Sequence, residues 1–376
     1  MTKKIPINMP QICKEEIQMV TKVMKSHVLT GRGGSGPMAT QFEKDFAKFA
    51  KAKNAVAVNS GTAALHMAVL TAKIRKGDEV ITPSFTFVAT AESVALVGAK
   101  PVFVDVDLCT YNIDPEKVES VITNKTKAII AVDLYGLPAA TDTLKEIAER
   151  HDLVLIEDAA QAHGALLKDK PVGYFADMAC WSFYASKNMT TGEGGMITTN
   201  KDEYASILRS LRSHGETKEY VSNILGHNYR MPEIEAAIGV AQLKKLPAFI
   251  EKRKNNAKML TQLLKGTRQL YLPNEPRGYR HAWYLYTVRI QKGDAAVRDK
   301  IVKDLAKQGV GAAVYYPVPI HLMPYYREFG EYNLPNTQQL ASQTFSLPVH
   351  PGLTAKDVEY VAKSVKQILR RNKIGI

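Results

Sequence analysis

The alternation of short apolar runs with longer helical patterns restricts the fold of this 376-residue chain more than any other feature. The runs are rich in Val and Ile, which favours strands buried on both faces. This alternation is typical of the α/β class, with a mostly parallel sheet flanked by helices. The seven predicted strands are 55–59, 79–83, 101–106, 128–133, 153–158, 178–183 and 195–199. Helices are predicted at 14–28, 38–51, 62–72, 86–97 and 202–213.

Two prolines bear on where the sheet domain ends. We expect Pro232 to be the first residue of a long helix, because its missing N–H would be unpaired there in any case. Pro247 should kink or interrupt that helix. The segments after it are a strand-like run at 283–290, a helix near 294–308 and an apolar run at 311–317. The sequence thus predicts a large domain over 1–246 and a smaller C-terminal α+β domain over 247–376.

The chain is basic, with 50 Lys and Arg against 37 Asp and Glu and a formal net charge of +13. Such an excess attracts polyanions, so a nucleic-acid-binding regulator has to be considered. The basic residues are spread along the whole chain, however, and no helix-turn-helix, zinc or RNA-binding signature accompanies them. Phosphate-bearing small molecules suit the same charge. We therefore expect small-molecule partners and no nucleic acid.

Membrane, secretory and metal-binding classes fit poorly. No stretch reaches the roughly 18 unbroken apolar residues of a membrane helix, and the first residues lack the apolar core of a secretory signal. Cys13, Cys109 and Cys180 form neither a CxxC pair nor a zinc spacing. Free thiols in a reducing compartment are the simplest interpretation. The expectation is a cytoplasmic location, with no membrane contact and no metal ion.

The segment from Gly31 to Gly36 reads GRGGSG and matches the letters of a dinucleotide-binding fingerprint. That fingerprint must follow a strand and open a helix within a βαβ unit. Here the segment follows a helical pattern and precedes Pro37. We therefore interpret it as a loop, and whether it covers a substrate stays open.

Ser60-Gly61-Thr62-Ala63 is better placed to bind phosphate, because it ends a predicted strand and opens a helix. Gly61 permits close approach of the backbone, and Ser60 and Thr62 offer hydroxyls. The unpaired N–H groups and positive end of a helix favour an anion. An ordinary helix cap uses the same residue types, so both interpretations remain open on these residues alone.

Asp158 and Lys187 complete a chemical pattern. Asp158 ends an apolar strand, where a carboxylate is either a helix cap or the partner of a cation. Lys187 lies between an apolar strand and a Gly-rich turn, where it is either a surface lysine or a Schiff-base amine. A phosphate site, an acidic residue and a lysine are what pyridoxal phosphate needs: the lysine binds it covalently and the carboxylate favours its protonated ring nitrogen.

These residues lie in segments that resemble the DegT-type nucleotide-sugar aminotransferases, which are fold-type I pyridoxal-phosphate enzymes. The matching segments are NSGTAAL, ITPSFTFVATAESV, VFVDVD, IEDAAQAHGA, WSFYASKNMTTGEGGMITT, RSHG, GHNYRMPEIEAAIGVAQL and, later, YYPVPIHLMPYY. The glycine loop at 31–36 is longer than the common TGP-containing form of the family. The resemblance implies the fold-type I architecture and pyridoxal 5'-phosphate as the cofactor.

By this resemblance Lys187 binds the cofactor covalently and moves the proton, and Asp158 pairs with the ring nitrogen. The other implied cofactor contacts are Gln161 at the ring hydroxyl, Phe87 stacked on the ring, and Gly61, Thr62 and Ser182 at the phosphate. Asn228 would reach the phosphate of the neighbouring subunit's cofactor, which implies a homodimer with composite sites. Weaker candidates for substrate contact, each with a structural polar role as the alternative, are His163, Glu193, His214, Tyr315 and His321.

The activity that the resemblance implies is transfer of an amino group from an amino acid, by family habit glutamate, to a nucleotide-linked keto sugar. Such a reaction belongs to amino-sugar or surface-polysaccharide biosynthesis. A dehydratase of the same family is one alternative, although that branch has histidine in the place of Lys187. Cyclitols and related keto acceptors are an alternative substrate class.

Overall fold

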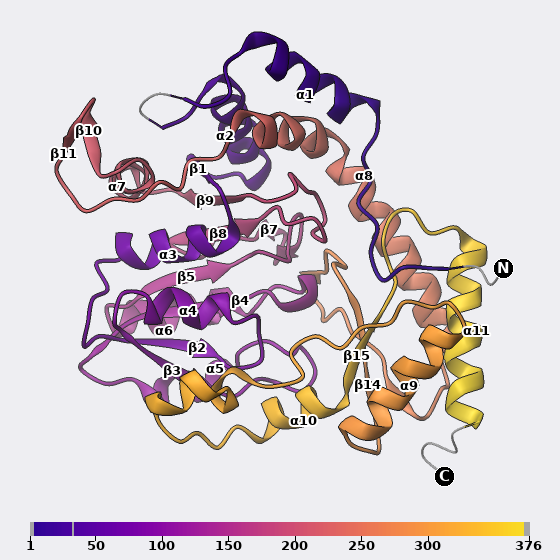
Figure 1. Ribbon diagram of the computed structural model, residues 1–376. Helices are drawn as coiled ribbons and strands as arrows, with labels where there is room; N and C mark the ends of the chain where they lie inside the picture. Colours follow the sequence, from indigo (N-terminus) through magenta and orange to yellow (C-terminus); the bar gives the residue numbers. More distant parts are fainter. Residues whose placement is uncertain (1–3, 32–33, 372–376) are drawn as a thin grey trace.

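The computed structural model describes residues 4–31 and 34–371. At its centre lies a seven-stranded sheet with the order β1-β9-β8-β5-β4-β2-β3 (Figure 1). Its strands are β1 (Asn54–Val58), β2 (Glu79–Pro83), β3 (Lys100–Val104), β4 (Thr126–Val132), β5 (Val154–Asp158), β8 (Met178–Ser182) and β9 (Gly195–Thr199). Each predicted strand is found within two residues of its expected bounds, which confirms the mostly parallel α/β sheet.

The directions of the strands place the carboxyl ends of the parallel strands at one edge of the sheet. The strands from β3 through β2, β4 and β5 to β8 are parallel, whereas β9 is antiparallel to both β8 and β1. The carboxyl ends of β2, β4, β5 and β8 therefore meet at the same edge, where open α/β sheets bind ligands.

Helices cover both faces of the sheet. On one face apolar residues of α3 (Gly61–Thr71), α4 (Ala89–Ala95) and α7 (Asp202–Arg212) pack against the strands. On the other face α2 (Pro37–Ala50), α6 (Thr141–Arg150) and α8 (Glu233–Leu264) do so. The helix predicted over 86–97 is shorter in the structure, because residues 84–88 form a non-helical connection from β2 to α4.

Helix α8 links the two parts of the molecule. Its 32 residues include Pro247 without interruption, so Pro247 does not end the helix. Figure 1 shows α8 bending between the part beside α1 (Lys14–Ser26) and α2 and the part beside α11 (Ala355–Arg371). The prediction for Pro232 is wrong by one position, because its ψ of 151° is extended and it caps the helix from outside. The division into domains at residue 246 stays a prediction.

The C-terminal part has its own core around a three-stranded antiparallel sheet. This sheet consists of β12 (Leu270–Tyr271), β14 (Tyr286–Ile290) and β15 (Thr344–Leu347). Apolar residues of α9 (Ala295–Lys307) and α11 pack against it. Ile5 joins the same core and bridges Val310, so the N-terminal segment packs on the C-terminal part.

The remaining elements are short. The strands are β6 (Leu166–Leu167), β7 (Lys170–Pro171), β10 (Glu216–Lys218), β11 (Val221–Ser222) and β13 (Tyr279–Arg280). The helices are α5 (Pro115–Val118), α10 (Pro335–Gln343) and the 3-10 turns Glu119–Val121, Leu134–Gly136, Ile320–Leu322 and Pro324–Phe329. No helix among the described residues is long and apolar enough to cross a bilayer.

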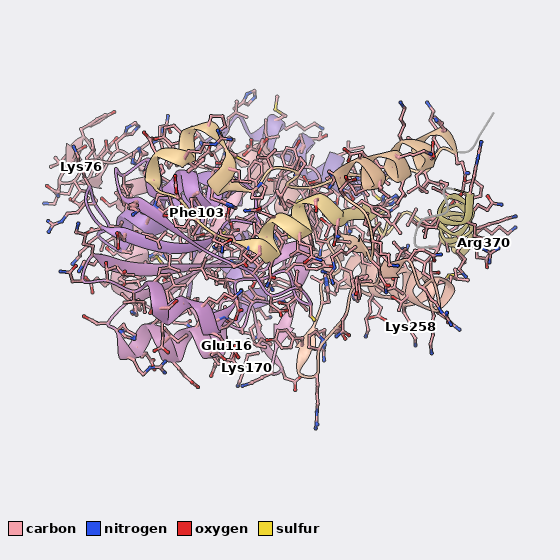
Figure 2. All side chains as sticks on the ribbon, turned by 90° about the horizontal axis from the view of Figure 1, so that it is seen from below. Lys76, Phe103, Glu116, Lys170, Lys258 and Arg370 are labelled. Atoms are coloured by element: carbon pink, nitrogen blue, oxygen red, sulfur yellow. The ribbon has the colours of Figure 1, made fainter. Side chains whose placement is uncertain are left out.

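The basic residues are spread along the whole chain, but the net charge is not, because acidic residues are sparse after residue 246. Residues 247–376 contain 21 Lys and Arg against 9 Asp and Glu, a balance of +12, which leaves +1 for residues 1–246. Lys258 and Arg370 lie at the end of the molecule opposite Lys76 (Figure 2). The excess charge thus belongs to the C-terminal part rather than to the strand ends of the large sheet.

Candidate active site

Asp158 is a buried carboxylate at the carboxyl end of β5, where it is 6% exposed. Thr90 Oγ1 donates a hydrogen bond of 2.9 Å to its Oδ2, and the Ala160 N–H donates one of 3.2 Å to its Oδ1. Burial raises the pKa of Asp158, while these two bonds and the positive charge of Lys187 oppose that rise. No described basic side chain forms an ion pair with it, so a cationic ligand group would find an available partner.

Lys187 follows β8 in a turn where its N–H donates a hydrogen bond to the Tyr184 carbonyl. Its Nζ lies 4.8 Å from the centre of the Tyr284 ring. The Tyr284 hydroxyl is in turn 2.9 Å from Ser186 Oγ, which holds the ring beside the lysine. No carboxylate of the described residues is paired with the Lys187 amine. Lys187 therefore has a chemically available amine next to the buried Asp158.

Gln161 lies in the loop after β5 and is 4% exposed. Its Oε1 accepts a hydrogen bond of 2.7 Å from the Tyr135 N–H, and its Nε2 donates one of 2.9 Å to the Tyr316 hydroxyl. One hydrogen of the Nε2 amide is left for a ligand. Because Tyr316 comes from the C-terminal part, Gln161 connects that part to the strand ends.

A cradle suited to phosphate lies where α3 begins. Ser60 caps this 11-residue helix by accepting a hydrogen bond from Ala63 N–H, and the earlier N–H groups have no acceptor within the helix. A Cβ built on Gly61 would lie 2.8 Å from the Cβ of Ser182, at the end of β8. Only glycine fits there, so the backbone of Gly61 comes close to Ser182. Thr62 and Ser60 border an open hollow of about 490 Å³.

Phe87 is not a core residue, since 56% of its surface is exposed. It lies in the connection between β2 and α4, and its carbonyl accepts a hydrogen bond from the Thr90 N–H. Thr90 in turn binds Asp158. Phe87 thus lies three residues before Thr90, the residue that contacts the Asp158 carboxylate. This position and its exposed ring are compatible with stacking on a ligand ring.

Asn228 and Glu193 lie on the open side of the cradle. Both are exposed, Glu193 borders the hollow beside Ser60 and Thr62, and Asn228 borders a neighbouring hollow together with Asn59 and Arg230. Asn228 is not a free turn residue, because its backbone bridges Ser213. Of the glycine loop, Arg32 and Gly33 lie outside the described residues.

The four remaining candidates for substrate contact differ in position. Tyr315 is half-buried, and burial raises its pKa, with smaller contributions from Tyr284 and Tyr184. It packs against the apolar cluster that contains Tyr284, whose ring lies beside Lys187. His163 is fully buried against Trp181 and Phe183, where burial lowers its pKa to about 3.

His321 is also buried, and its Nδ1 is 2.7 Å from Ser84 Oγ. His214 is exposed near the β10–β11 hairpin, where Ser222 Oγ donates to its carbonyl. The structure therefore places Tyr315 in the cluster that contains Tyr284 and gives His163 and His321 packed positions. Their proposed substrate contacts stay predictions.

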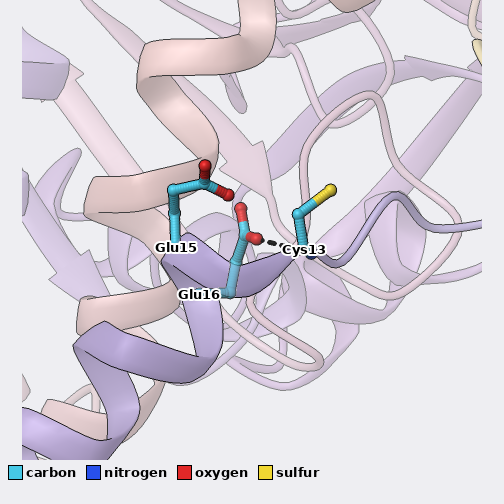
Figure 3. Close-up of side chains that lie close together, drawn as sticks. All are labelled: Cys13, Glu15 and Glu16. Atoms are coloured by element: carbon cyan, nitrogen blue, oxygen red, sulfur yellow. Dashed lines mark hydrogen bonds between the residues drawn. The ribbon is translucent and has the colours of Figure 1, made fainter.

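One described group has metal-ligating atoms close together, namely Cys13, Glu15 and Glu16 at the start of α1 (Figure 3). Glu16 accepts a hydrogen bond of 2.8 Å from the Cys13 N–H, as in a capping box. Lys245 Nζ lies 3.0 Å from Glu15 and 2.8 Å from Glu16. The lysine already balances these carboxylates, so the group has a structural explanation.

Three contacts of the site were missed in the sequence. Thr90 fixes Asp158, Tyr284 lies beside Lys187, and Tyr316 binds Gln161. Thr90 lies inside a family-like segment, so the sequence could have drawn attention to it. Its role, however, depends on how α4 brings it to Asp158 at the end of β5. Tyr316 is adjacent to Tyr315, and the sequence did not reveal which of the two hydroxyls points to Gln161.

Comparison with known proteins identifies the family. The model of the DegT/DnrJ/EryC1/StrS aminotransferase family matches residues 10–366. The chain belongs to this family. It is an aminotransferase, and enzymes of this family depend on pyridoxal phosphate. The cradle at Gly61 and the buried carboxylate of Asp158 fit that cofactor.

Relatives of this aminotransferase extend over nearly its whole length. A protein of Geobacillus stearothermophilus named pleiotropic regulatory protein is 40% identical over 96% of each chain. The GDP-perosamine synthase of Caulobacter vibrioides is 39% identical over 97% of this chain and 98% of its own. The Helicobacter pylori aminotransferase involved in the biosynthesis of pseudoaminic acid has a TM-score of 0.93 and 30% identity, covering 98% of this chain and 100% of its own. The family therefore includes sugar aminotransferases with the same fold.

Proposed function

We propose that this enzyme transfers an amino group from an amino acid, with glutamate as the expected donor, to a keto sugar linked to a nucleotide. The observation that carries the chemistry is the buried Asp158 carboxylate, which forms no ion pair with a described side chain, near the Lys187 amine. The nucleotide-linked substrate is supported by relatives, among them a UDP-N-acetyl-3-dehydro-alpha-D-glucosamine 3-aminotransferase of Acidithiobacillus ferrooxidans, 37% identical over 92% of this chain and 95% of its own.

The residues around the site have distinct tasks in this reaction. When bound, pyridoxal phosphate supplies the carbonyl that accepts the amine and the ring that withdraws electrons. Asp158 would hold a proton at the ring nitrogen, because a neighbouring negative charge favours the charged form. Lys187 Nζ would bind the cofactor, then take a proton from the donor carbon and return one to the sugar carbon. Thr90 keeps the carboxylate of Asp158 in place.

The other cofactor contacts are proposed by position. Gly61, Thr62 and Ser182 would bind the phosphate at the start of α3, and Phe87 would stack on the ring. Gln161 would use its remaining amide hydrogen at the ring hydroxyl. Glu193, His214, Tyr315, His163 and His321 are proposed more weakly for the substrate. A location in the cytoplasm stays a prediction.

A homodimer with composite sites is part of the proposal. Asn228 is exposed on the open side of the cradle, where a second copy could place its own Asn228 near the phosphate. Leu96 borders the adjacent hollow beside Ser60 and Thr62 and is 62% exposed, which suits a surface that a second copy covers. The partner subunit would then close the side of the site that one chain leaves open.

Two alternatives make different predictions. A dehydratase must avoid returning a proton to the sugar carbon, whereas the amine of Lys187 favours that step. A regulator that binds nucleic acid would use the C-terminal charge, and its binding would weaken steeply with salt. Retention of a yellow cofactor bound to Lys187, without salt-dependent DNA binding, separates the enzyme from the regulator.

The test uses the two half-reactions separately. Glutamate should convert the pyridoxal form of the holoenzyme to the pyridoxamine form, seen as loss of visible absorbance. A panel of nucleotide-linked keto sugars should then restore the absorbance and yield an amino sugar. If no amino donor converts the cofactor, the transaminase proposal is wrong. If only free keto acids or cyclitols restore it, the chemistry stands and the nucleotide-sugar substrate does not.

A further inference from the structure

Two fully buried carboxyl groups lie on the far side of β5 from the cofactor site. Asp133 follows β4 and Glu157 precedes Asp158, and both are 0% exposed. Leu155 packs against α6, so Glu157, two residues later in the strand, faces the same side. Asp158 faces the opposite side, toward Thr90. Nothing in the proposed reaction uses this pair.

Each of the two carboxyl groups accepts a backbone hydrogen bond at one oxygen and leaves its other oxygen without one. The Ala139 N–H donates a bond of 2.8 Å to Asp133 Oδ1, and the Gly173 N–H donates one of 2.6 Å to Glu157 Oε2. The other two oxygens, Asp133 Oδ2 and Glu157 Oε1, are buried and accept no hydrogen bond, although the Thr141 side chain is close enough to Glu157 to lower its pKa. The side chains are within hydrogen-bonding reach of each other. Two ionised groups would repel there, whereas one proton between them makes an O–H···O⁻ bond.

We propose that Asp133 and Glu157 share one proton, and that this bond is a positioning device that holds the loop after β4 against the carboxyl end of β5. Asp133 is well placed for this, because its N–H donates a bond of 3.1 Å to the Asp158 carbonyl. Its side chain binds Ala139 at the other end of the loop. Within the loop, the Tyr135 N–H binds Gln161. The positioning part rests on the proposed cofactor contacts of Asp158 and Gln161.

The surroundings keep the shared proton in place at neutral pH. Burial raises the pKa of both groups, and the negative charges of Glu157 and, to a smaller extent, Asp158 add to the rise for Asp133. On β13, burial raises the pKa of Tyr279, and the negative charges of Asp142 and Asp133 add to that rise. From α6, Lys145 lies 3.6 Å from Asp177 and forms no ion pair with Asp133 or Glu157. The described charges around the pair therefore do not favour a second negative charge.

Proton counting tests the shared proton without cofactor or substrate. The folded pair keeps one proton that the unfolded chain releases above about pH 4, so stability should fall as pH rises. Urea unfolding of the full chain is measured from pH 5 to 7. The double variant Asp133→Asn with Glu157→Gln keeps an amide hydrogen bond and has no proton to lose. With each pH unit, the ratio of the wild-type unfolding constant to that of the double variant should rise about tenfold.

The control is Asp142→Asn, which removes a carboxylate from the first turn of α6 outside the pair and should leave the pH slope unchanged. Equal slopes in wild type and double variant would show that both groups are ionised. A hundredfold difference per pH unit would show that both are protonated. Either result overturns the proposal. Carbon-13 labelling of Asp and Glu side chains counts the same protons in the wild type if the double variant does not fold.

Affinity for pyridoxal phosphate tests the positioning role. Asp133→Leu leaves Glu157 and the Ala139 N–H without a partner, and should weaken cofactor binding at least tenfold. Asp133→Asn restores both contacts, because its Oδ1 can accept from Ala139 and its Nδ2 can donate to Glu157. It should bind within about threefold of the wild type. Equal affinity of the Leu and Asn variants would remove the positioning role. Neither proton counting nor cofactor affinity involves a sugar. Failure of this proposal can therefore be distinguished from failure of the proposed function.

Discussion

The candidate site has a buried inner end, at Asp158 and Gln161, and an exposed outer end, at Phe87, Asn228 and Glu193. The two ends are built differently. At the inner end Asp158 and Gln161 are buried, and each forms two hydrogen bonds with its neighbours. At the outer end Phe87 is 56% exposed, and Asn228 and Glu193 lie on the surface. One chain thus completes the end that we assign to the ring nitrogen. The phosphate end is open, which is where a second subunit or a large substrate could contribute.

The largest effect is expected from Lys187→Ala at the inner end. Without the amine, the site loses the group that we propose binds the cofactor covalently and moves the proton, so turnover should fall at least about 10⁴-fold. The fold should survive, because the half-exposed Lys187 amine has no described ion pair to lose. Turnover and thermal unfolding check both expectations, with the exposed Lys170→Ala as the control. Borohydride treatment of the wild type should attach the cofactor to a peptide containing Lys187, and a label on another lysine would refute the assignment.

Asp158→Asn should have the next largest effect. The amide keeps the shape and can still accept from Thr90, but it loses the charge that holds a proton on the ring nitrogen. A loss of about 1000-fold in kcat would correspond to roughly 4 kcal/mol of barrier. Steady-state kinetics measure it, and Thr90→Val, which leaves the charge intact, should lose far less. Wild-type turnover in Asp158→Asn would mean that the carboxylate only caps the following turn.

The sequence predicted the inner end of the site better than the outer end. The inner end depends on strand ends, and apolar runs revealed these within two residues, so Asp158 and Ser182 could be placed from the sequence. Thr90 and Tyr316 could not, because their contacts arise from the packing of separate elements. His163 and His321 were weaker candidates for substrate contact, with a structural role as the alternative. Both are buried, and local sequence does not show which face of a segment is buried. At the open end, phosphate binding at the start of the helix after Ser60 was one of two interpretations of the sequence, whereas Phe87 and Asn228 were implied only by the resemblance.

Asn228 tests whether a second chain completes the outer end. Asn228→Ala and Lys187→Ala should each be nearly inactive as homodimers. Mixed in equal amounts and allowed to exchange subunits, half of the dimers would be hybrids with one intact site, so about a quarter of the wild-type activity should return. Activity assays before and after mixing, together with sedimentation, measure this. A fully active monomer, or no recovery despite exchange, would contradict a composite site.

Gly61→Ala should weaken the phosphate cradle with a smaller effect. The added Cβ would lie 2.8 Å from the Cβ of Ser182, so the start of α3 must move away from β8. The N–H groups there would lose their geometry toward phosphate, and affinity for pyridoxal phosphate should fall about tenfold. Titration of the apo-protein measures this, and binding of pyridoxal without the phosphate should change much less. An equal loss for both ligands would place the defect elsewhere.

Phe87→Leu should give the smallest effect, and it distinguishes ligand stacking from packing. Because Phe87 is 56% exposed, its replacement removes little buried surface and should leave the unfolding temperature nearly unchanged. Loss of a stacked ring is worth about 0.5–1.5 kcal/mol, which corresponds to a roughly 2- to 12-fold weaker affinity for pyridoxal phosphate. Phe103→Leu is the matched control, since Phe103 is 1% exposed and should lose stability while keeping cofactor affinity. If Phe87→Leu behaves like Phe103→Leu, Phe87 is a packing residue, and the outer end lacks the ring contact that the resemblance implies.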